Sequence, residues 1–154
     1  MSLSNNLIFF IAALITGALI PIQAQTNAGF SRAIGSAQTT GLMVFVMGVI
    51  VMSLYVLVTA TPLPKMEQLT AAPWYSYLGG LIVPIYVISI TLLVPRIGVG
   101  AAIGLIVTGQ ILCAVAIDHF GFFNAAIQKI DIRRTIGVVL MIAGVYFVMG
   151  KKGN

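Results

Sequence analysis

Charged side chains are scarce in this sequence. Aspartate and glutamate together number three, and all charged residues make up 7% of the chain, against about 25% in a typical soluble domain. Hydrophobic residues make up 60%, and the mean hydropathy is +1.10. So few charges cannot cover the surface of a folded chain in water, which excludes an ordinary soluble domain.

Histidine and cysteine each occur once, as His119 and Cys113. A single cysteine cannot form an internal disulfide, and one histidine with one cysteine gives no metal-binding cluster. The sequence also contains no serine nucleophile elbow and no phosphate-binding loop. We therefore predict no enzymatic activity, no cofactor and no metal site.

A basic cluster interleaved with aromatic residues is also missing. The net charge of +5 is spread over short polar segments and the chain ends. Nucleic acid is therefore not an expected partner. Positive flanks beside a lipid bilayer explain these charges more simply.

Long apolar runs are what the sequence does contain. They predict five membrane-spanning helices at about 7–30, 37–60, 74–94, 99–117 and 135–150, because a span needs roughly 20 apolar residues. The runs do not alternate polar and apolar residues as barrel strands do. We predict an all-α, multi-pass membrane protein with one transmembrane domain over 1–154. The first run is longer than a signal peptide and has no basic residue before it, so cleavage is not expected.

A shorter amphipathic segment lies between the fourth and fifth runs. Apolar residues recur there at helical spacing, opposite a group of polar residues. This pattern predicts an interfacial helix at about 122–131. The apolar positions are Phe123, Ile127 and Ile130, and the polar ones are Gln128, Lys129 and Asp131.

Three amides interrupt the first apolar run. On a helix, Thr16, Gln23 and Asn27 fall within about 40° of one another, whereas Gln25 points the opposite way. A stripe of small residues runs beside them, at Ala13, Gly17, Ala24 and Ala28. An unpaired amide in hydrocarbon costs several kcal/mol. We therefore expect this helix to face a polar interior, with another helix close by.

The later runs contribute fewer polar candidates. Tyr86 lies two residues after Pro84, whose missing N–H frees a carbonyl and favours a kink. This helix either lines a cavity or curves around its neighbours. Gln110 is the only amide near the middle of its run. The predicted substrate-binding residues are Gln23, Asn27, Tyr86 and Gln110.

Glycines mark the expected packing surfaces. Gly100 and Gly104 form a small-xxx-small pair, and Gly137 and Gly144 share one face of the fifth run. With Gly17, they are predicted to serve helix packing or a dimer contact. An intramolecular seam is the commoner use of such a pair.

Asp118 is the one carboxylate at the end of a span, and it is followed by His119. Such a pair would suit a proton relay in a proton-coupled carrier. Alternatively, Asp118 caps or pins the following loop, paired with His119 or a nearby arginine. The residues leave both roles open.

The basic residues do not fix an orientation. With five spans, each side of the membrane receives four of them, whereas the positive-inside rule needs a difference. Either a subtler feature sets the orientation, or the chain inserts both ways and pairs with an inverted copy. The two sets are Lys65, Lys129, Arg133 and Arg134, against Arg32, Arg96, Lys151 and Lys152.

With these residues in view, the chain resembles the five-helix YdcZ-like family of the drug/metabolite transporter superfamily. The motifs that carry the resemblance are Gly17 to Gly29, Pro73-Trp74 before Gly79-Gly80, Pro95 to Gly98, Gly109-Gln110, Asp118 to Gly121 and Gly137 to Val145. The resemblance implies a bacterial inner-membrane protein whose working unit has ten helices, built from two five-helix halves of opposite orientation. It specifies no substrate.

The related small multidrug resistance proteins use a glutamate in their first helix to bind cations and protons. This chain has only amides in its first run, which favours neutral or weakly polar solutes. We therefore expect a secondary transporter or facilitator of a small organic solute, working as an antiparallel homodimer. The alternative is a non-transporting membrane scaffold or accessory subunit, in which the amides only join helices. Water access to Gln23 discriminates between them.

Overall fold

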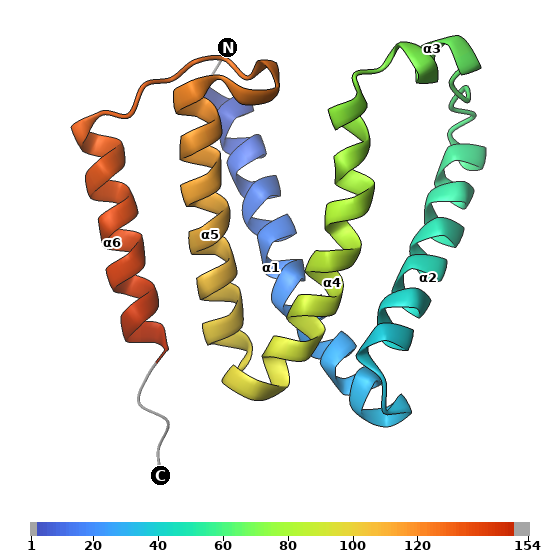
Figure 1. The fold of residues 1–154 in the computed structure, drawn as a ribbon, viewed down its shortest axis with the longest axis horizontal. Coiled ribbons are helices and arrows are strands. Elements are labelled where there is room, and N and C mark those ends of the chain that lie inside the picture. The colour runs from blue at the N-terminus through green and yellow to red at the C-terminus, as the bar shows by residue number, and fades with distance from the viewer. Residues whose placement is uncertain (1–2, 150–154) are drawn as a thin grey trace. The chain divides into compact units, whose positions relative to one another are not determined.

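A computed structural model describes residues 3–149 (Figure 1). These residues form helices joined by short turns and loops, with no strand among them. The elements in chain order are α1 (Leu3–Ile34), α2 (Ala37–Val58), α3 (Met66–Ala71), the 3-10 helix η1 (Trp74–Tyr77), α4 (Leu78–Ile97), α5 (Val99–Phe120), the 3-10 helix η2 (Phe122–Asn124) and α6 (Ile132–Val148).

Four helical segments are long and apolar enough to cross a membrane. They are Leu7–Ile34, Ala37–Val58, Trp74–Ile97 and Val99–Phe120. By length and composition, these segments agree with four of the five predicted spans. Three of them run further than predicted: α1 continues through Arg32, α4 continues through Pro95 and Arg96, and α5 continues from 117 to Phe120. The turns therefore fall at Gly35 and Gly98, whose positive φ angles of 74° and 85° end the preceding helices.

The fifth predicted span, 135–150, corresponds to α6, which has 17 residues. At 1.5 Å per residue such a helix is about 25 Å long, against a hydrocarbon core of about 30 Å. Gly150 at the end of the predicted span, and Lys151 and Lys152 beyond it, lie outside the described residues. Length alone therefore does not make α6 a fifth span.

The chain divides into two compact units, Met1–Leu92 and Leu93–Asn154. In the first unit, α1 packs against α2 across a two-residue turn. Ser36 makes that turn short, because its Oγ accepts a hydrogen bond of 3.1 Å from the Thr39 N–H and caps α2.

The core of the first unit consists of one narrow stripe on each long helix. Each stripe follows the i, i+3, i+4 spacing of a single helix face. At α2, the backbone of Gly41 lets α4 approach, since a Cβ there would lie 3.3 Å from Ile88 Cγ1. The stripes are Ala24, Asn27 and Ala28 on α1, Ala37, Thr40 and Gly41 on α2, and Val87, Ile90 and Thr91 on α4.

In the second unit, α5 and α6 pack side by side (Figure 1). The seam is formed by two glycines of α5 against two valines of α6. A Cβ at Gly104 would lie 3.1 Å from Val145 Cγ1, and one at Gly100 would lie 3.7 Å from Val148 Cγ1. These two glycines therefore make an intramolecular seam.

The interfacial helix predicted at about 122–131 is absent. The structure has only the 3-10 turn Phe122–Asn124 there, and residues 125–131 are not helical. Gly121, Phe123 and Asn124 have φ angles of 67°, 57° and 62°, which interrupt a right-handed helix. The apolar spacing is present but does not make this backbone helical, because the N–H groups of Gln128 and Ile130 donate to Asp118 and His119 of α5 rather than to carbonyls one turn earlier.

Candidate functional site

The two amides predicted to line a polar interior lie on different parts of the α1 surface. Asn27 belongs to the buried stripe and is 7% exposed. Gln23, one turn earlier, is exposed at the edge of that stripe, and Gln25 is exposed as well. The 40° that separates Gln23 from Asn27 on the helix is enough to move one of them out of the core.

Asn27 is unusual because its buried amide is unpaired. Its Nδ2 is inaccessible and donates no hydrogen bond to any group in residues 3–149. Leaving such a donor unsatisfied costs about 1–3 kcal/mol, and most buried polar groups are bonded. Asn27 is thus a polar group that its own chain buries without satisfying.

Two buried threonines join Asn27 in the core of the first unit. Thr40 is fully buried and Thr91 is 1% exposed. Each hydroxyl donates to a carbonyl one turn earlier in its own helix, Thr40 to Ser36 O at 2.9 Å and Thr91 to Val87 O at 2.7 Å. The oxygen of each hydroxyl remains able to accept a bond. Neither threonine was among the residues predicted for the site, although each shares a helix face with small or apolar neighbours.

The other predicted substrate-binding residues are placed less deeply. Tyr86 is half-buried on α4, one residue before the buried stripe of that helix. Within the first unit no hydrogen bond joins Gln23, Asn27 and Tyr86 to one another. Gln110 belongs to the second unit, where it is exposed on α5.

Asp118 and His119 hold the loop that leads from α5 to α6. Asp118 Oδ2 accepts a hydrogen bond of 3.3 Å from Arg134 Nη1, and the Asp118 carbonyl accepts one of 2.8 Å from the Gln128 N–H. His119 Nδ1 accepts a bond of 3.1 Å from the Ile130 N–H. Arg134 also donates to the Gln128 side chain. These contacts favour the pinning role of Asp118.

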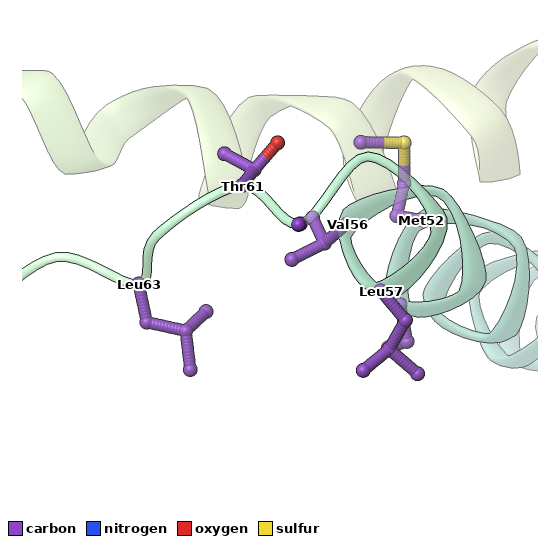
Figure 2. A pocket seen from close by; sticks show the side chains of 7 residues that line it. Met52, Val56, Leu57, Thr61 and Leu63 are labelled. Atoms are coloured by element: carbon purple, nitrogen blue, oxygen red, sulfur yellow. The ribbon is translucent and has the colours of Figure 1, made fainter.

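One surface hollow lies in the first unit, at the end of α2 and in the loop after it (Figure 2). Its volume is about 590 Å³, and its lining is apolar apart from the hydroxyls of Ser53 and Thr61. The Thr61 hydroxyl is already bonded to that of Thr59 at 2.7 Å. This hollow offers contact area but little means of selecting a polar solute.

A second hollow, of about 390 Å³, lies between α5 and α6. Apolar side chains line most of it, and Asp118 and Arg134 stand at its loop end. Gln23, Asn27, Tyr86 and Gln110 line neither hollow. Residues 3–149 bring together no three His, Cys, Asp or Glu side chains that could hold a metal ion.

Comparison with known proteins decides the family. The family described as "Putative inner membrane exporter, YdcZ" matches residues 8–147. The chain belongs to this family. The match covers α1 from residue 8 onward, the other three long apolar helices in full and nearly all of α6.

Membership confirms the resemblance drawn from the motifs and the inner-membrane location. It also places the protein in a family that is described as exporters, that is, as transporters rather than enzymes. No curated protein and no solved structure matched the chain. The family description names no substrate and no substrate-binding residue.

Proposed function

We propose that this exporter-family protein moves a small, uncharged polar organic molecule, as a secondary transporter or facilitator, through a site built around Asn27. Gln23 and Tyr86 contribute to this site, and Gln110 on α5 is proposed separately as a substrate-binding residue. Amides would hydrogen-bond the solute, and the Tyr86 ring would pack against it.

The observation that carries this proposal is the unpaired Nδ2 of Asn27. A free donor in a buried position gains a hydrogen bond when a carbonyl, ether or hydroxyl oxygen of a solute reaches it. The closed core then corresponds to the site without solute. The free energy lost by leaving the Asn27 donor unpaired is regained when the solute binds. Reaching Asn27 requires α1 to separate from its neighbours, as alternating access does.

The charges of the spans support an uncharged solute. Segments Leu7–Ile34, Ala37–Val58 and Trp74–Ile97 contain no Asp or Glu. A cation in this core would have no carboxylate to pair with, and an unpaired buried charge costs far more than an unpaired amide. Cation export through a carboxylate in the first helix is therefore not part of the proposal.

An antiparallel homodimer is the assembly we propose. Within the single chain, only 6% of the most hydrophobic part of α1, α2 and α5 is buried. Lipid or a second copy must cover the rest. A second copy of opposite orientation would give the inverted-repeat plan that many transporters share.

The alternative is a scaffold role, and the unpaired amide of Asn27 is evidence against it. An amide that joins helices does so by bonding to the neighbouring helix, at about 0.6–2 kcal/mol. Asn27 makes no such bond within residues 3–149. The free-energy cost of burying this unpaired donor has an explanation in a binding site, where a solute can accept the bond, but none in a purely structural role.

Water access to α1 tests the proposal. With Cys113→Ala as background, we expect Gln23→Cys to react with a small aqueous thiol reagent several-fold faster than Gln25→Cys. The two positions carry the same side chain and lie about 3 Å apart along the helix, but point in opposite directions. Equal rates, or no reaction at Gln23→Cys, would remove the pathway along this face of α1.

A further inference from the structure

The α5–α6 pair is packed tightly at one end and open at the other. At the tight end, the glycines of α5 meet valine methyl groups, as at Gly104 against Val145. At the loop end, Gly137 of α6 faces empty space, since a Cβ added there would have no other atom within 4 Å. The hollow of about 390 Å³ occupies this end.

Two matching helix faces line the hollow. On α5 it is bounded by residues from Ile111 to Asp118, and on α6 by residues from Arg134 to Met141, each set at i, i+3, i+4 and i+7. Ala114 carries only a methyl group and Gly137 has no side chain, which leaves space between the helices. We call this open, largely apolar hollow the slot; the only charged groups that line it are Asp118 and Arg134 at its loop end.

The charged end of the slot is accessible. The side chains of Asp118 and Arg134 are 39% and 31% exposed, and a single contact of 3.3 Å joins them. Asp118 Oδ1 accepts no hydrogen bond from residues 3–149. An anionic group can therefore approach the guanidinium while a cationic N–H group approaches the carboxylate.

The adjoining loop indicates the depth of this end in the membrane. Phe120 at the end of α5 and Phe122 and Phe123 in the loop are 64%, 53% and 57% exposed, and exposed apolar side chains beside basic residues suit the membrane–water interface. Lys129 lies in the same loop and Arg133 lies in the first turn of α6, positions that suit contact with anionic head groups. The charged end thus lies at head-group level, and the apolar slot extends toward the hydrocarbon.

We propose that the slot binds one phospholipid whose head group carries both a phosphate and a primary ammonium. The phosphate pairs with Arg134, the ammonium donates to Asp118, and one acyl chain lies along the slot between Ala114 and Gly137. A free polar solute would leave the apolar slot unfilled. A purely anionic lipid would place its negative phosphate beside the Asp118 carboxylate, with no ammonium to pair with that carboxylate. This site does not depend on the solute that the protein transports.

Native mass spectrometry of the full-length, delipidated protein in detergent tests the proposal. The probes are phosphatidylethanolamine, phosphatidylcholine and phosphatidylglycerol with identical acyl chains. Phosphatidylcholine keeps the positive charge but has no N–H to donate, and phosphatidylglycerol has no ammonium. We expect one retained phosphatidylethanolamine per chain, bound about tenfold more tightly than either of the others, because a hydrogen bond to a charged group is lost with each.

Variants separate the slot from its charged end. Gly137→Leu fills the slot and should abolish retention of all three lipids. Gly144→Leu is the matched control, because it also faces open space but does not line the slot. Asp118→Asn should retain lipid but lose the preference for phosphatidylethanolamine over phosphatidylglycerol.

Three results would overturn the proposal. One is equal retention by Gly137→Leu and the native chain. Another is a preference for phosphatidylglycerol, which would assign the charged end to anionic lipid alone. The third is a loss of the dimer, rather than of lipid, in a Gly137→Leu variant whose circular dichroism is native, which would assign the slot to a second copy. If Gly137→Leu does not fold, the head-group preference and its loss in Asp118→Asn decide.

Discussion

At the scale of single residues, Asn27 differs from the other polar groups of its core. Thr40 and Thr91 are as deeply buried, but each hydroxyl donates to its own helix. The Asn27 Nδ2 makes no such bond to its own helix, so its amide depends on a partner from elsewhere. The sequence predicted that Asn27 would face an interior. It did not reveal that this amide would be unpaired, because pairing depends on where α2 and α4 place their acceptors.

The stability of Asn27→Ala follows from this difference. The substitution removes no hydrogen bond and leaves only a small cavity, so we expect the free energy of unfolding to change by less than about 1 kcal/mol. Thermal unfolding of the purified protein in detergent measures the change. A loss of about 2 kcal/mol or more would show that Asn27 holds helices together, in favour of the scaffold.

At the scale of elements, apolar length predicted the four long helices well. Their ends depended on finer signals, such as the Ser36 cap and the positive φ angles of Gly35 and Gly98. The prediction of a helix at 122–131 was wrong for a different reason. The apolar spacing of this segment suited a helix, but Gln128 and Ile130 bond to Asp118 and His119, 10 and 11 residues earlier. Periodicity in a short segment carries no information on such long-range bonds.

The seam between α5 and α6 gives a prediction at this scale. A leucine at Gly104 would overlap Val145, whose Cγ1 lies 3.1 Å from an added Cβ. We expect Gly104→Leu to destabilise the protein by about 1–3 kcal/mol and Val145→Ala to restore part of the loss when combined with it. Thermal unfolding of the single and double variants measures both effects.

Gly109→Leu is the control for this pair, because it lies on the same helix with no atom within 4 Å of an added Cβ. It should leave the melting temperature close to that of the native chain. If Gly104→Leu were equally harmless, or if Val145→Ala gave no rescue, the glycine–valine seam would not describe the packing of α5 on α6.

At the scale of the whole molecule, the family and the membrane location were within reach of the sequence, whereas the assembly was not. The family match and the four long helices agree with the motifs and the apolar runs. The assembly depends on α6, which is short for a span. If α6 crosses the membrane, the basic residues divide four against four. If it does not, Lys151 and Lys152 join the side of Lys65, Lys129, Arg133 and Arg134, giving six against two.

These two divisions predict different insertion. A balance of four against four leaves the chain free to insert both ways and to form an inverted homodimer. A division of six against two fixes one orientation and removes the inverted copy. Two inverted copies around a shared polar site are the central claim of the proposed function.

The orientation of the C-terminus tests this claim most directly. With Cys113→Ala as background and Gly153→Cys as the probe, intact cells are labelled with a thiol reagent that cannot cross the membrane, and again after permeabilisation. The inverted homodimer predicts that about half of the molecules label from outside, as equal charge on the two sides requires. Labelling of essentially all or none of them from outside would contradict it.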